Sequence, residues 1–295
     1  MAEISAQAPD RSAKDPDRRP LTGPPFEVLR PFERFAFRLM RFFNAGGGVR
    51  ASMAWQWVVL TWLFGMFVHR RIVVRGWDRL QTIPEKASIM MVTNHRTFFD
   101  QFIIGWLLFL SPRHHRKSSF PVRANFFYEH PAGLLITLIL SGGSMFPPFF
   151  RRPEAKPFNK YSLGILTDLL RQPGNLIGFH PEGTRNKGPD PYQLLPAQPG
   201  AGEVALKARP IIVPAFITGL TNDLLSELWA NIRGKRPIVI VFGNPLDVSD
   251  WPAETRLSHA KKCADFLNGK IAALMEEEKA VRASAAFRPE GRPGR

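Results

Sequence analysis

The spacing of apolar residues predicts two helices near the start of the chain. In residues 31–44, apolar side chains recur at helical spacing with arginines between them: Phe32, Phe35, Leu39, Phe42 and Phe43. This pattern is typical of a basic amphipathic helix, which the three glycines at 46–48 would end. A second apolar segment, 51–68, contains three tryptophans and no charged residue, and arginines flank it on both sides.

The segment 51–68 allows three interpretations. It is at the lower length limit for crossing a bilayer, Gln56 and Thr61 disfavour a span, and basic residues on both flanks give no orientation. Tryptophans with flanking arginines are typical of helices that lie at a membrane interface. We therefore predict that the two helices form a hairpin seated in one leaflet. A single span and a helix packed on the domain's own core are the alternatives.

Beyond residue 70, short β-rich runs alternate with longer apolar runs. This favours an α/β domain, with a largely parallel mixed sheet flanked by helices. The predicted divisions are a disordered leader at 1–28, membrane-anchoring helices at 29–70, the main folded domain at 71–282, to which the family resemblance given below assigns the activity, and a disordered tail at 283–295. The strand-like runs are 71–74, 87–93, 120–122, 175–179, 211–217 and 237–242, and the helix-like runs are 98–110, 133–140, 161–170 and 257–278.

Composition limits the classes of partner that the chain is expected to bind. The net charge is +15 and 44% of residues are hydrophobic, which indicates an anionic partner, either nucleic acid or a membrane surface. Because many arginines sit beside tryptophan- and phenylalanine-rich segments, we favour lipid and expect no nucleic acid. Cys263 is the only cysteine, and His114-His115 has no carboxylate beside it, so we expect neither a disulfide nor a metal site. The first twenty residues show no export signal, which predicts the cytoplasmic face of a membrane.

A candidate catalytic motif covers residues 94–100. It follows a strand-like run and opens a helix-like run, which places His95 on a turn at a sheet edge. Positions five apart diverge by about 140° on a regular helix, so Asp100 can meet His95 only if the histidine lies in the turn. Asp100 would then accept a hydrogen bond from one ring nitrogen, and the other nitrogen could take a proton from a hydroxyl.

A second polar turn follows the strand-like run 175–179. Pro181 and Gly183 break the strand, and Glu182, Thr184 and Arg185 bring polar groups to the tip of the turn. The glycine lets backbone amides approach an oxyanion, and an arginine suits bidentate binding of phosphate. Taken alone, this turn also fits an ordinary surface loop.

Together the two motifs resemble a known enzyme family. Asn-His-x4-Asp at 94–100 and Phe-x-Pro-Glu-Gly-Thr-Arg at 179–185 closely resemble the first and third sequence blocks of the PlsC-like glycerolipid acyltransferases. This is the family of the 1-acylglycerol-3-phosphate acyltransferases. Residues 212–215 resemble its fourth block, and 199–202 resemble the glycine-containing stretch after the third. The resemblance covers residues 71–248.

The resemblance implies roles for named residues. His95 would deprotonate the acceptor hydroxyl and Asp100 would orient the histidine. The donor would be an acyl thioester of coenzyme A or acyl carrier protein, with no cofactor and no covalent acyl-enzyme. The absence of a Gly-x-Ser-x-Gly motif from the sequence agrees with this. The residues expected to bind the acceptor are Asn94, Thr97, Arg151, Arg152, Glu182, Gly183, Thr184 and Arg185.

The second block departs from the family pattern. The family usually places an arginine that binds glycerol phosphate soon after a Gly-x-Ile-Phe-like run. Here prolines and phenylalanines shift Arg151 and Arg152 to later positions, so either can reach a phosphate only if Pro147-Pro148 bulges. Gln198 stands where many relatives have lysine, which further weakens the case for a phosphorylated acceptor.

The sequence therefore predicts a membrane-associated O-acyltransferase, peripheral or with a single span. The expected acceptor is 1-acylglycerol 3-phosphate and the expected product is phosphatidate. Alternative acceptors are glycerol 3-phosphate, lyso-phosphatidylethanolamine and a phosphate-free lyso-lipid. The alternative class is a non-catalytic basic protein that binds membranes or nucleic acid.

Overall fold

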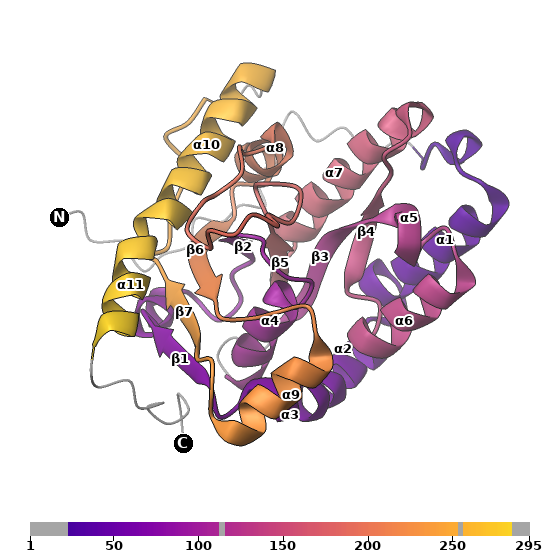
Figure 1. Cartoon of the computed structure of the whole chain (residues 1–295). Helices are drawn as coiled ribbons and strands as arrows, with labels where there is room; N and C mark the ends of the chain where they lie inside the picture. The colour runs from indigo at the N-terminus through magenta and orange to yellow at the C-terminus, as the bar shows by residue number, and fades with distance from the viewer. Residues whose placement is uncertain (1–22, 112–115, 253–255, 285–295) are drawn as a thin grey trace.

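The computed structural model describes residues 23–111, 116–252 and 256–284, and within them a seven-stranded mixed sheet forms the centre of the molecule (Figure 1). The strand order is β1-β7-β6-β2-β5-β3-β4, and every neighbouring pair is parallel except β6 and β7. The predicted α/β class and largely parallel sheet are confirmed. The strands are β1 Ile72–Arg75, β2 Ile89–Thr93, β3 Lys117–Arg123, β4 Met145–Phe149, β5 Asn175–Phe179, β6 Ile211–Thr218 and β7 Ile238–Phe242.

Helices cover both faces of the sheet (Figure 1). The first two, α1 Pro31–Ala45 and α2 Val49–Val58, are followed by a π-helical turn, Val59–Phe64, and by α3 Gly65–Val68. In the part of the chain that the structure describes, 3-10 turns lie at Phe26–Val28, Asp78–Thr82 and Pro153–Ala155. The later helices are α4 Asp100–Leu110, α5 Ala124–Phe127, α6 Pro131–Ser141, α7 Lys156–Arg171, α8 Pro199–Ala208, α9 Leu224–Arg233, α10 Leu257–Ala273 and α11 Met275–Ala283.

The central strand β2 divides the core into two layers. All five of its residues are buried, and alternate side chains point to opposite faces. Met90 and Val92 pack with α1, α7, α8 and α10, whereas Ile89 and Met91 pack with α4 and the helical run that ends in α3. A strand that is apolar on both faces in this way is expected in the middle of a parallel sheet.

The first helix forms where it was predicted, but it uses a different face. Its buried side carries Ala36, Phe37 and Met40, and the Phe37 ring packs on Phe146 and Phe158 of the core. The predicted apolar stripe instead faces outward in part: Phe35 is 56% exposed. The apolar surface of α1 is wide, from the exposed Phe35 and Phe42 to the buried Ala36 and Met40, so periodicity identified the helix without showing which part of this surface the core would take.

The second helical segment is continuous from Val49 to Val68. It is long and apolar enough to cross a membrane by length and composition, and 39% of it is buried against the rest of the protein. A core helix of a soluble protein passes the same test, and the hairpin, the single span and the helix packed on the core all stay predictions.

Other sequence expectations differ from the structure in detail. Strand β4 and helices α8 and α9 lie outside the predicted runs, and the predicted helix at 257–278 is divided at Leu274 into α10 and α11. Cys263 is buried in the core, as expected for a small apolar residue, and burial raises the pKa of its thiol to about 11. His114-His115 and the ends of the chain lie outside the described residues.

Candidate active site

The two predicted motifs meet at one edge of the sheet. Strands β2 and β5 are parallel neighbours, so the turns that follow them emerge side by side. His95 follows β2, and its backbone N–H donates to the Glu182 carboxylate at 2.8 Å. Its backbone carbonyl accepts from the N–H of Asn186 at 2.7 Å. The turn after β5 therefore holds the backbone of His95 from both sides.

The surroundings of Asp100 favour its ionised form beside His95. The distance from His95 Nδ1 to Asp100 Oδ2 is 3.2 Å, and the same oxygen accepts the backbone N–H groups of Arg96 and Thr97 at 2.8 and 2.9 Å. The Thr97 hydroxyl donates to the other oxygen at 2.6 Å. Burial alone would raise the pKa of Asp100, but the hydrogen bond from His95, the nearby histidines and Thr97 outweigh it and hold the pKa below its usual value.

This geometry suits a general base. The Asp100 carboxylate accepts a hydrogen bond from Nδ1–H of His95, which leaves Nε2 free to accept a proton from another molecule. The His95 side chain is 21% exposed and that of Asp100 is 2% exposed, so the imidazole is accessible while its partner is shielded. The structure brings the two residues together in the turn-to-helix arrangement that their spacing predicted.

Glu182 holds the backbone of the catalytic turn in place. Its carboxylate accepts two backbone N–H groups at 2.8 Å, those of His95 and Leu195, and the residue is 2% exposed. Burial raises its pKa, although both hydrogen bonds act in the opposite direction. The carboxylate is thus committed to the backbone, and direct contact with the acceptor stays a prediction that the geometry does not favour.

His180 was not predicted as a site residue. Its ring stacks on that of His95, with centroids 3.7 Å apart and planes 9° from parallel. Its Nδ1 lies 3.1 Å from the backbone carbonyl of Thr93, and burial lowers its pKa to about 3, so the ring is neutral. The sequence did contain a signal for this position. His180 stands between a buried strand-like run and Pro181, so it must lie at the start of the turn after β5, beside the turn that carries His95.

A metal ion does not fit this group of side chains. Ligand atoms of His95, Asp100 and His180 lie within 4.8 Å of one another. However, an imidazole binds a metal in its own plane, and the planes of two stacked rings do not meet at a common ligand distance. The expectation that no metal takes part stays a prediction.

Three arginines gather beside the catalytic turn. Arg123 at the end of β3 donates to the carbonyl of Gly183 at 3.3 Å. Its pKa is lowered by burial and by the positive charges of Arg151 and Arg185. Arg185 also donates to Asn222 at 3.2 Å. The chain therefore concentrates positive charge at exposed side chains next to the accessible histidine, an arrangement that attracts an anion.

Arg123 was not among the predicted site residues. It lies far from both motifs in the sequence and carries no motif of its own. Only the parallel pairing of β3 with β5 brings it to the turn after β5.

The two arginines of the second block have different surroundings. Strand β4 contains one extra residue opposite Phe120–Val122, so the Pro-Pro segment has the irregularity that an arginine after it would need to reach a phosphate. After it, Arg151 is exposed beside Arg123, whereas Arg152 donates to both carboxylate oxygens of Glu33 on α1. The Glu33 hydrogen bond raises the pKa of Arg152. Arg152 thus fastens α1 to the domain.

The remaining predicted binding residues are also described. Both polar ends of the Asn94 side chain bind the backbone of Ile217 on β6, at 2.8 and 2.9 Å. Thr97 is 3% exposed and engaged with Asp100, so for both residues contact with the acceptor stays a prediction that the geometry does not favour. Gly183 has φ +64°, a backbone conformation that favours glycine, and Thr184 is half-buried in the same turn.

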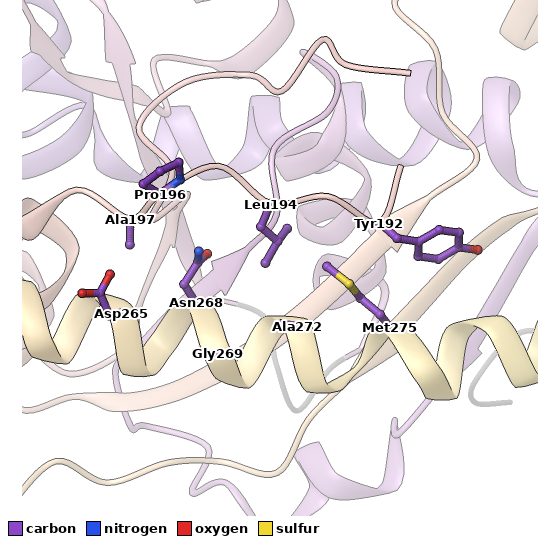
Figure 2. Close-up of a pocket in the computed structure, with 9 residues that line it drawn as sticks. All are labelled: Tyr192, Leu194, Pro196, Ala197, Asp265, Asn268, Gly269, Ala272 and Met275. Atoms are coloured by element: carbon purple, nitrogen blue, oxygen red, sulfur yellow. The ribbon is translucent and has the colours of Figure 1, made fainter. Parts of the chain in front are cut away.

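A cavity also lies away from the catalytic turn. It has a volume of about 270 Å³ and is formed between α10 and the segment 192–197 (Figure 2). Asn268 of α10 donates to the Leu195 carbonyl at 3.1 Å there. None of the cavity's lining residues belongs to the catalytic turn or to the arginine cluster, so the candidate site is an open edge of the sheet rather than this cavity.

A family model and a known relative identify the family of this chain. The acyltransferase family model matches residues 71–218. The 1-acyl-sn-glycerol-3-phosphate acyltransferase of Haemophilus influenzae is 34% identical over 215 residues, which cover 73% of this chain and 78% of that protein. The crystal structure of PlsC, the 1-acyl-sn-glycerophosphate acyltransferase of Thermotoga maritima, aligns over 84% of this chain and 88% of that chain, with 19% identity and a TM-score of 0.47. The family model covers half of this chain and the Haemophilus relative covers most of it, so the protein is an enzyme that belongs to the acyltransferase family.

Proposed function

We propose that this acyltransferase transfers a fatty acyl group from an acyl thioester to the free hydroxyl of 1-acylglycerol 3-phosphate, giving phosphatidate. The observation that carries the proposal is the accessible His95–Asp100 pair beside a cluster of three arginines. The name of the Haemophilus relative supports the same acceptor. The donor is an acyl thioester of coenzyme A or of acyl carrier protein.

The pair performs the proton transfers of the reaction. Nε2 of His95 takes the proton of the acceptor hydroxyl as the oxygen attacks the thioester carbonyl. Asp100 stabilises the imidazolium that forms and keeps the proton on Nδ1. The carbon–sulfur bond then breaks, and the thiolate leaves with the proton held on Nε2. The oxygen gains the acyl group, the sulfur gains the proton, and no covalent acyl-enzyme forms.

The arginine cluster supports a phosphorylated acceptor. Arg123, Arg151 and Arg185 repel one another in the free enzyme, which is one cause of the lowered pKa of Arg123. A phosphate monoester placed among them would relieve this repulsion and accept charge-assisted hydrogen bonds. We assign the phosphate to Arg151 rather than Arg152, because Glu33 already holds Arg152.

The acceptor is a membrane lipid, so the proposal includes binding to the cytoplasmic face of a membrane through the helices of residues 29–70. Large apolar side chains there are exposed, and arginines lie among them. These side chains are Phe35, Phe42, Trp55, Trp57 and Trp62.

An acceptor panel tests the proposal. Purified enzyme is given 1-acylglycerol 3-phosphate, glycerol 3-phosphate, lyso-phosphatidylethanolamine or a monoacylglycerol, each with acyl-CoA and with acyl carrier protein thioester. We expect the highest kcat/KM for 1-acylglycerol 3-phosphate, because it combines a phosphate monoester with a lipid chain. Equal or higher kcat/KM for the monoacylglycerol would contradict the assigned acceptor.

A further inference from the structure

Helix α9 presents an apolar stripe to the outside. Leu225 is 70% exposed, Trp229 56% and Ile232 50%, and their spacing of four and three residues places them on one side of the helix. Large apolar side chains so exposed in a contiguous row mark a contact surface. This helix lies outside residues 29–70, so the proposed anchor does not include it.

The opposite side of α9 is fastened to the protein by polar contacts. Asn231 donates to the Met66 carbonyl of α3 at 2.7 Å and accepts from the backbone N–H of Arg70 at 2.9 Å. The buried Glu227 carboxylate pairs with the Arg71 guanidinium. These contacts fix the rotation of the helix, so its apolar stripe cannot turn toward the core.

The stripe continues into the N-terminal helices. Met66, next to α9, is 49% exposed and Trp62 is 70% exposed. Further along the same helical run, Trp55 donates to the Ile139 carbonyl of α6 at 2.8 Å. In Figure 1, α2, α3, α6 and α9 lie along one side of the molecule. We call this surface the apolar belt; it comprises Trp55, Trp62, Met66, Leu135, Ile139, Leu225, Trp229 and Ile232.

Charge at the end of α9 indicates what covers the belt. Arg233 lies over the Trp229 ring at 5.4 Å, and Lys235 and Arg236 follow directly. From residue 228 to residue 246 the sequence contains no aspartate or glutamate. Apolar side chains bordered by basic residues match the acyl region and anionic headgroups of a bilayer, since each part meets its complement.

The start of α9 is also tied to the catalytic turn. The side-chain oxygen of Asn222, two residues before the helix, accepts from the backbone N–H of Phe98 at 2.8 Å and from Arg185 at 3.2 Å. A bilayer that covers α9 therefore lies close to the arginine cluster. A lipid acceptor could reach His95 from the membrane without passing through bulk water.

We propose that α9 is a second membrane contact, which joins the N-terminal helices in one apolar belt and seats the enzyme on an anionic bilayer beside its active site. This rests on the proposed function only in that the acceptor is a membrane lipid. Vesicle binding by α9 is measured separately from catalysis.

The test is vesicle co-sedimentation of the full chain with the double substitution Leu225→Glu and Trp229→Glu. Vesicles of phosphatidylcholine are compared with vesicles that also contain phosphatidylglycerol. We expect at least about a tenfold loss of partition, since burying one leucine alone is worth about that factor. The matched control is Leu257→Glu on α10, a helix that lies apart from α2, α3, α6 and α9 in Figure 1. This leucine is 73% exposed, and the variant should bind as wild type.

Two further measurements keep the outcomes distinct. Turnover of a short-chain acceptor dissolved as monomers should be unchanged in the double variant, which shows that the site is intact. Arg233→Ala with Lys235→Ala should reduce binding only to phosphatidylglycerol-containing vesicles. Unchanged partition of the double variant, or an equal loss in Leu257→Glu, would overturn the proposal.

The stripe could also bury itself in a second copy of the chain. A concentration-dependent dimer that the double substitution abolishes, with vesicle binding unchanged, would overturn the lipid assignment. Failure of the proposed acceptor would appear differently, as absent turnover of 1-acylglycerol 3-phosphate by an enzyme that still binds vesicles through α9.

Discussion

The ring of His180 lies flat on the ring of His95, with centroids 3.7 Å apart. His180 is anchored to the end of β2 through Thr93, and burial lowers its pKa to about 3. The candidate general base is therefore held between a neutral aromatic platform and the charged Asp100. This arrangement fixes the ring plane of His95 without adding a second positive charge to the site.

The lowered pKa of His180 makes stability depend on pH. Between about pH 3 and 6.5 the unfolded chain binds a proton at this position and the folded chain does not, so stability falls as pH falls through that range. His180→Phe keeps an aromatic ring and removes the titration. We expect wild type to lose more free energy of unfolding than His180→Phe between pH 7 and pH 5, measured by urea unfolding. An equal loss in both proteins would contradict this role.

Asp100→Asn should nearly abolish turnover. The amide cannot hold the His95 proton on Nδ1 as a carboxylate does and does not stabilise the imidazolium, so kcat should fall about a thousandfold or more. Steady-state kinetics with 1-acylglycerol 3-phosphate give the value. A kcat within tenfold of wild type would show that Asp100 has only a structural role.

Substitution of Arg151 should weaken acceptor binding, whereas substitution of Arg152 should lower the stability of the fold. Arg151→Ala removes one proposed phosphate contact, and KM for 1-acylglycerol 3-phosphate should rise about tenfold with little change in kcat. Arg152→Ala leaves the Glu33 carboxylate buried without its arginine and should cost about 2 kcal/mol of stability. Kinetics and urea unfolding of both variants test this division of roles. A stability loss in Arg151→Ala together with a KM increase in Arg152→Ala would assign the phosphate to Arg152 instead.

Glu182→Gln should slow the reaction by displacing the backbone of His95. A glutamine offers one acceptor oxygen for the backbone N–H groups of His95 and Leu195, and its amide nitrogen would face the other donor. We expect kcat to fall about ten- to a hundredfold while KM for the acceptor changes little. A rise in KM at constant kcat would instead favour direct contact of Glu182 with the acceptor.

Much of the sheet could be predicted because its strands are apolar and short. The run 175–179 matches β5 residue for residue, and the spacing of His95 and Asp100 correctly required a turn before a helix. Strand β4 was missed because two prolines occupy its centre, where their missing N–H groups argue against a strand. The antiparallel pairing of β6 with β7 depends on tertiary packing and has no local signature.

The candidate site was only partly predictable for a related reason. The motifs identified most of the site residues, but the role of each residue depends on the side chains that it contacts in the fold. Arg151 and Arg152 are adjacent in sequence, and only the packing of α1 shows that Glu33 occupies one of them. Arg123 and His180 join the site through strand pairing, which brings together positions that are distant along the chain.

The most direct test of the account is the rate of acyl transfer by His95→Ala. The enzyme and the variant are compared with 1-acylglycerol 3-phosphate and acyl-CoA, together with urea unfolding and vesicle binding as controls for structure. We expect kcat to fall at least about a thousandfold while stability and vesicle binding persist, because only the proton-accepting group is removed. Turnover at the wild-type rate by a folded, membrane-bound His95→Ala enzyme would contradict it.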